Sequence, residues 1–138
     1  LKNSDYHILL KPHSITNMDI MYKILKNFDK KRFSVVNYHI AFISQISDIV
    51  IGNYFSQAMP DAWASGTKTI EFSKYDQRVL KHCKNGSVSK EYVDVFINGS
   101  PSLLVKELKK KNKKIKRKIS KNLNNDTMQL IKQLSFNK

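Results

Sequence analysis

The sequence contains few of the cysteines that stabilise small extracellular or metal-binding domains through disulfides or metal ions. Cys83 is the single cysteine among 138 residues, so no disulfide can form within the chain and a zinc site built from several cysteines is excluded. No apolar run approaches the roughly eighteen residues of a membrane-spanning helix. Residues 1–10 lack the basic, apolar and small-residue order of a signal peptide. These absences predict a free thiol in a reducing compartment and a cytoplasmic protein.

An initiator methionine is also missing, because the chain begins at Leu1 in the approach to a predicted strand. We therefore expect a piece of a longer protein. Hydrophobic residues make up 41% of the sequence and aromatic residues 10%, which is enough for a core. The length suits one compact domain.

Acidic residues are scarce, and the excess of positive charge is confined to one segment. The chain has 25 Lys and Arg against 11 Asp and Glu, a net charge of +14. Residues 1–105 account for only +4 of it, whereas residues 106–121, KELKKKNKKIKRKISK, account for +9. We therefore divide the chain into a domain at 1–105 and a basic C-terminal segment at 106–138.

Stretches rich in β-forming residues alternate with stretches of helical periodicity. The predicted strands lie around residues 8–10, 32–38, 47–54, 67–72 and 92–99, and the predicted helices around 17–28, 40–46 and 56–66. Helical segments of about ten residues between strands favour βαβ units, because parallel neighbours need such crossovers. The sequence therefore predicts an α/β fold with a Rossmann-like parallel sheet flanked by helices.

The basic segment is predicted to continue a helix that starts at Ser100-Pro101. Five apolar residues fall close to one face of such a helix: Leu104, Leu108, Ile115, Ile119 and Leu123. Two interpretations of its lysines stay open. They form a solvated helix surface, or the stretch from Lys106 to Lys121 binds an anionic membrane surface.

Two polar loops follow predicted strands, at the sheet edge where open parallel sheets bind ligands. The first is Lys11-Pro12-His13-Ser14, and the second spans residues 53–57. A helix that begins near Ser56 presents free backbone N–H groups, which attract anions. If His13 and Ser56 face each other across adjacent strand ends, they can bind a phosphate. The alternatives are a plain strand end at His13, an ordinary helix cap at Ser56, and a Lys11 side chain that points to solvent.

Two acidic residues have simpler predicted roles. Asp61 falls in the first turn of the helix over 56–66, where a carboxylate stabilises the helix dipole. Glu71 lies near the end of the strand at 67–72. It suits a ribose hydroxyl at the same sheet edge, or it is a solvated strand end.

The motifs LLKPHS (residues 9–14) and ISDIVIGNYFSQAMPDAWASGTKTIEF (residues 46–72) together resemble a known family. They are similar to the C-terminal half of GT-B-fold transferases that build bacterial surface polysaccharides, including capsule polysaccharide transferases, CDP-glycerol glycerophosphotransferases and GT-B sialyltransferases. Asp61-Ala62 followed by Gly66 looks like the acidic-Ala-x-x-x-Gly stretch of these families. The likeness covers about residues 6–73.

The resemblance implies that His13 and Ser56 contact the nucleotide phosphate, as the corresponding histidine and serine of these families do. With the other polar residues of the two loops and the strand end, the predicted nucleotide-binding set is Lys11, His13, Ser14, Ser56, Gln57 and Glu71, and His13 is the best candidate for a catalytic group. The implied partners are a CMP, CDP or UDP donor and a polysaccharide or lipid-linked acceptor. No Asp-x-Asp motif occurs, so neither a metal nor another cofactor is expected. Ser14 replaces a family proline and Phe55 replaces a frequent serine. The N-terminal half of a GT-B enzyme is missing, so this chain alone should bind nucleotide weakly and catalyse nothing.

Two other functions are weighed against the transferase. A nucleic-acid-binding module would use residues 106–121 to neutralise phosphates, but that segment has no aromatic residues for stacking and the rest of the chain is nearly balanced in charge. A UDP-sugar epimerase-like GT-B protein is the third alternative. The paired glycines that follow the serine turn in that family are absent here.

Overall fold

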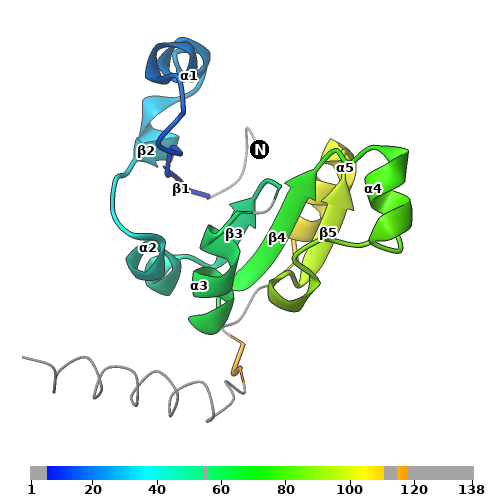
Figure 1. Cartoon of the computed structure of the whole chain (residues 1–138). Helices are drawn as coiled ribbons and strands as arrows, with labels where there is room; N and C mark the ends of the chain where they lie inside the picture. The colour runs from blue at the N-terminus through cyan, green and yellow to red at the C-terminus, as the bar shows by residue number, and fades with distance from the viewer. Residues whose placement is uncertain (1–5, 55, 111–114, 118–138) are drawn as a thin grey trace, which may run out of the picture.

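The computed structural model describes residues 6–54, 56–110 and 115–117, which form an α/β arrangement with short parallel strands (Figure 1). The strands are β1 (Ile8–Leu10), β2 (Phe33–Val35), β3 (Ile49–Gly52), β4 (Lys68–Ser73) and β5 (Val95–Asn98). Every pair of neighbouring strands is parallel. The predicted α/β class with parallel strands is therefore confirmed.

Helices connect these strands, and most of them lie where periodicity predicted them. They are α1 (Met18–Leu25), α2 (Ile40–Ile46), α3 (Ala58–Ala64), α4 (Gln77–His82) and α5 (Pro101–Leu108), with short 3₁₀ turns at Lys30–Arg32 and Lys90–Tyr92. Asn17 caps α1, because its Oδ1 accepts the N–H of Ile20 at 3.1 Å. The sequence did not predict α4, whose residues are mostly polar. Asp76 starts that helix by accepting the N–H groups of Arg78 and Val79.

The strands form two sheets instead of the single sheet expected from the sequence. β1 pairs with β2, and β3, β4 and β5 form a second sheet in that order. In Figure 1, β1, β2 and α1 make a lobe that extends away from the second sheet. None of residues 6–42 is buried, so no apolar core holds this lobe against the rest of the chain.

The hydrophobic core lies under the three-stranded sheet. Val50 on β3 packs with Met59 and Ala62 on α3, and Ile40 and Val93 border this cluster. The buried hydrophobic residues of the described chain are Ile43, Val50, Met59, Ala62, Ile70, Tyr75 and Ile97. Gly52 permits the close approach of α3, since a Cβ at this position would lie 2.6 Å from the Met59 Sδ atom.

The helix predicted to run through the basic segment is wrong over the residues that can be checked. α5 ends at Leu108, and residues 115–117 are not helical. They lie against the end of α3, where the Ile115 N–H donates to the Gly66 carbonyl at 2.8 Å. Closely spaced lysines repel one another along a helix, which favours an early end to α5. Ile119 and Leu123 lie outside the described residues.

Within the described ranges, every helix is too short or too polar to cross a bilayer.

Candidate functional site

The carboxyl edge of the β3–β4–β5 sheet carries a connected set of polar groups. The Ser73 Oγ atom at the end of β4 accepts the backbone N–H of Tyr54, which follows β3, at 2.8 Å. The Asn98 Oδ1 atom at the end of β5 accepts the backbone N–H of Tyr75 at 2.8 Å. These bonds tie the three strand ends together and fix the loops where parallel sheets bind ligands.

Glu71 lies at the centre of this edge and is only 2% exposed. Its carboxylate accepts hydrogen bonds from three hydroxyl groups: Ser73 at 2.8 Å, Tyr75 and Ser87. Burial of a carboxylate without a cation is costly unless its oxygens are hydrogen-bonded, and these hydroxyls satisfy both oxygens. The interpretation of Glu71 as a solvated strand end is therefore wrong. A ribose hydroxyl would reach it only by replacing one of the three donors.

Burial and the bond to Glu71 raise the pKa of the Tyr75 hydroxyl well above its ordinary value. Tyr75 therefore stays protonated and remains a hydrogen-bond donor at any physiological pH. Its ring also stacks on Phe96, with centroids 5.3 Å apart. The network is thus anchored by aromatic packing as well as by hydrogen bonds.

Tyr54 forms the exposed rim of the edge. Its φ of 34° lies in the left-handed region, which a bulky residue rarely adopts outside strained or functional turns. Its hydroxyl donates to the Lys74 carbonyl at 2.7 Å, and its ring lies 5.5 Å from that of Tyr75. The side chain nevertheless remains 44% exposed. The protein therefore holds one aromatic ring in a fixed place at the rim, and sequence reasoning did not single it out.

The second predicted loop belongs to this edge, because Gly52 at the end of β3 pairs with Glu71. α3 begins at Ala58, two residues later than Ser56, and Gln57 is its exposed N-cap residue without a side-chain capping bond. The Ser56 Oγ atom accepts the N–H of Ala58 at 3.4 Å, which is a weak capping contact. Asp61 lies in the first turn of α3, as predicted.

The first predicted loop lies elsewhere. Lys11, His13 and Ser14 are exposed and follow β1, which belongs to the other sheet. The His13 Nδ1 atom accepts the N–H of Ile15 at 3.3 Å and lies 3.5 Å from the Ser14 Oγ atom. Among the described residues, no hydrogen bond joins this loop to Ser56. The structure brings the second loop and Glu71 together and leaves the first loop apart.

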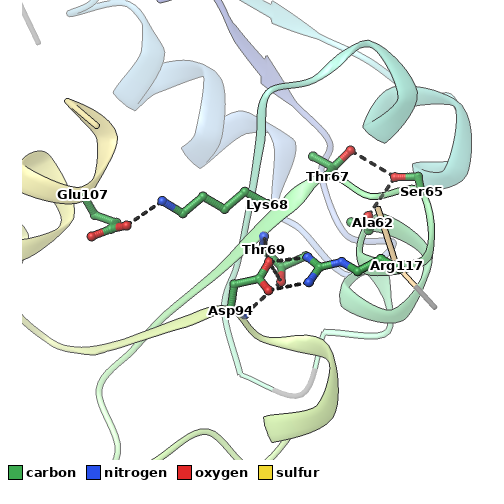
Figure 2. Close-up of polar contacts among 8 residues, drawn as sticks. All are labelled: Ala62, Ser65, Thr67, Lys68, Thr69, Asp94, Glu107 and Arg117. Carbon is green, nitrogen blue, oxygen red and sulfur yellow. Dashed lines mark hydrogen bonds and ion pairs between the residues drawn. The ribbon is translucent and has the colours of Figure 1, made fainter. Parts of the chain in front are cut away.

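The opposite, amino edge of the same sheet holds a partly buried ion pair that the sequence did not reveal (Figure 2). The two terminal nitrogens of Arg117 donate to the Asp94 carboxylate at 2.8 and 2.6 Å. Asp94 also accepts the N–H and hydroxyl of Thr69 at 2.9 and 3.1 Å. The Arg117 guanidinium lies 4.8 Å from the centre of the Trp63 ring, a cation–π distance.

Burial alone would raise the pKa of Asp94, but the hydrogen bonds from Arg117 and Thr69 outweigh it and hold that pKa below its ordinary value. The pKa of Glu107 is also lower than its ordinary value. The cause is the ammonium groups of Lys110 and Lys68, which each lie 2.5 Å from its carboxylate. Lys110 and Arg117 of the basic segment therefore form ion pairs with acids of the same chain.

A pocket of about 510 Å³ lies beside this region, between α4 and β5. Its lining includes Cys83, Lys84, Ser87, Lys90 and Phe96. In the part of the chain that the structure describes, no group of three or more potential metal ligands occurs. The pocket therefore offers a thiol, two ammonium groups, the imidazole of His82 and the carboxylate of Asp94.

Comparison of the chain with protein-family models, curated proteins and solved structures finds no match. The resemblance to GT-B transferases therefore stays a prediction, and the function must be argued from the residues themselves.

Proposed function

We propose that this chain is the donor-nucleotide-binding domain of a transferase that moves a glycosyl or glycerophosphoryl group from a CMP, CDP or UDP carrier to a surface polysaccharide. The observation that supports the proposal is the carboxyl edge of the three-stranded sheet. There, a strained and exposed Tyr54 stands beside the buried Glu71 network, and the Ser56 hydroxyl follows on the same loop. An aromatic ring and a nearby hydroxyl suit a base and a phosphate.

Each of these groups has a defined task in such a transfer. The Tyr54 ring stacks on the nucleobase, an interaction that contributes about 1–3 kcal/mol per base. Negative charge develops on the departing phosphate, so a donor at this edge such as Ser56 stabilises the transition state, and His13 and Lys11 would add to it if the first loop met the same edge. Loss of one such donor typically costs about 3–4 kcal/mol. Acceptor binding belongs to a partner domain in this proposal.

The lysines of residues 106–121 place the enzyme at the cytoplasmic face of a membrane in the same proposal. Each lysine near an anionic surface contributes about 1 kcal/mol, and lipid-linked acceptors are found there. The chain is expected to bind vesicles that contain anionic lipids at low salt and to dissociate at high salt. Absence of binding at low salt would remove the membrane from the proposal.

Calorimetric titration with CMP, CDP and UDP tests the nucleotide site. Tyr54→Ala should weaken the binding of the preferred nucleotide about tenfold or more, as loss of a stacking ring predicts, and Ser56→Ala should weaken it as well. Tyr92→Ala and Ser47→Ala are the matched controls, because Tyr92 precedes β5 and Ser47 precedes β3, at the opposite, amino edge of the sheet. Equal affinity in all four variants would contradict the proposal.

A filter-binding titration separates this proposal from a nucleic-acid-binding module. The transferase predicts that any RNA or DNA binding is lost when residues 106–138 are deleted, because it comes from lysine charge alone. Tight binding that survives the deletion would favour the nucleic-acid module.

A further inference from the structure

Four strands of the described structure, β1, β2, β3 and β5, have an edge without a neighbouring strand. β1 pairs only with β2, and β3 pairs only with β4. Ile8 on β1 is 42% exposed and Ile51 on β3 is 47% exposed, although both belong to continuous apolar runs. Such runs are typical of parallel strands that are covered on both faces. An unpaired edge also presents free N–H and C=O groups that can accept another strand.

The lobe of β1, β2 and α1 exposes much of its apolar surface. Seven of the sixteen large hydrophobic side chains that are exposed in the described chain lie within residues 6–35, which form this lobe. Ile20 and Ile24, one turn apart on α1, are both more than half exposed. Exposed apolar surface on this scale indicates an interface that is open in this structure.

The topology of the chain identifies β1 as the strand that fits the edge of β3. Pairing of β1 with β3 would give the order β2-β1-β3-β4-β5, which is a known order for doubly wound parallel sheets. In this order the connection from β2 to β3 must cross over β1, and α2 forms that connection. α2 already contacts α3 (Figure 1), the next helix along the chain, as this crossover requires. The Tyr6 hydroxyl donates to the carbonyl of Leu108 at the end of α5, so the approach to β1 is already tied to a helix of the other sheet.

We propose that β1 pairs with β3 to form one five-stranded parallel sheet, and that this closure completes the phosphate-binding site. In the closed sheet, the connection after β1 leads to β2 on one side, whereas the connection after β3 leads to β4 on the other side. Doubly wound sheets bind their ligands at such a switch point. Closure would bring His13 and Ser14 beside Asn53 and Ser56, where they can bind the phosphates of a nucleoside diphosphate. This second part rests on the proposed function, whereas the strand pairing does not.

Disulfide trapping in the full chain tests the pairing. If the carboxyl ends of the two strands are aligned, Leu9 lies opposite Ile51, so the test variant carries Leu9→Cys and Ile51→Cys with Cys83→Ser. The control variant carries Leu9→Cys and Asn98→Cys with Cys83→Ser, because β5 lies two strands beyond β3. Paired strands fall within the Cα separation of a disulfide, and we expect the test pair to oxidise within one chain about tenfold faster than the control. Intact mass and non-reducing gels report the product.

Equal oxidation rates for the two variants would overturn the pairing. Disulfides that form only between chains would also overturn it, because a second copy would then occupy the edge of β3. Hydrogen exchange of the unmodified chain gives an independent measurement, in which the β3 amides that do not bond to β4 should exchange slowly. Rapid exchange of these amides would contradict the proposal.

CDP titration of the trapped chain distinguishes the two parts. The oxidised test variant should bind CDP more tightly than the same variant after reduction. Equal affinity in the two states would overturn the completed phosphate site and leave the strand pairing intact. Failure of both states to bind any of the three nucleotides would instead contradict the proposed function.

Discussion

Replacement of Arg117 by alanine should destabilise the chain by about 2–3 kcal/mol. Hydrogen bonds to charged groups contribute about 1.5–3 kcal/mol, and Arg117 donates two of them to Asp94. Its contact with Trp63 adds about 1 kcal/mol. Two features reduce the expected loss below the sum of these contributions. The Arg117 and Asp94 side chains remain 11% and 20% exposed to solvent, and the Arg117 Nε atom is buried without a hydrogen-bond partner.

Urea unfolding followed by fluorescence measures this loss directly, because Trp63 is the only tryptophan and Arg117 lies over its ring. Lys116→Ala is the matched control, since it removes the same charge from an exposed neighbour. A double-mutant cycle with Asp94→Asn separates the contribution of the Arg117–Asp94 ion pair from that of the contact with Trp63. We expect a coupling energy of about 1–2 kcal/mol between the two residues.

The reasoning would be refuted if Arg117→Ala and Lys116→Ala differed by less than about 0.5 kcal/mol, the usual range for surface substitutions. A coupling near zero in the cycle would assign any loss to packing on Trp63 instead of to the ion pair.

Three further outcomes are expected. Glu71→Ala should lower the free energy of unfolding by about 3 kcal/mol or more in thermal melts, because three buried hydroxyls lose their acceptor, while Glu71→Gln should cost less. The pKa values of Asp94 and Glu107 are held below their ordinary values of 3.8 and 4.5. The stabilisation by these two carboxylates is therefore complete above about pH 5 and is lost as the pH falls further. The midpoint of urea unfolding should be lower at about pH 3 than at about pH 7, and equal midpoints would contradict this prediction. Gly66→Ala should cost more than about 2 kcal/mol in urea unfolding, because φ is +78° and an added Cβ would lie 2.5 Å from the Ile115 carbonyl oxygen, whereas Gly86→Ala should cost less, since an added Cβ there would lie 3.3 Å from the Cys83 carbonyl oxygen.

Local patterns in the sequence predicted most of the elements. The apolar run at residues 8–10, the periodic stretch after Asn17 and the glycine at position 66 each specify a strand, a helix start or a helix end through short-range physics. The division into two sheets and the end of α5 could not be predicted in this way. The division into two sheets depends on which strand edges pair, and the end of α5 depends on the ion pair between Arg117 and Asp94, which lie 23 residues apart in the sequence.

The candidate site was only partly visible in the sequence. The position of Glu71 at the carboxyl edge follows from strand direction, but its burial depends on Ser87, which comes from a polar loop 16 residues later. The backbone conformation of Tyr54 carries no sequence signature, because the residue is neither glycine nor asparagine. The juxtaposition of His13 with Ser56 remains a prediction that strand closure would fulfil.

The uneven placement of the core has a consequence for biosynthesis. All buried hydrophobic residues of the described chain lie from Ile43 onward, so β1 and β2 are synthesised before the core residues of this domain. At about 5–20 residues per second, Ile97 is added roughly 3–12 seconds after Val35, the last residue of β2. During that interval β1 and β2 expose apolar surface to which chaperones bind.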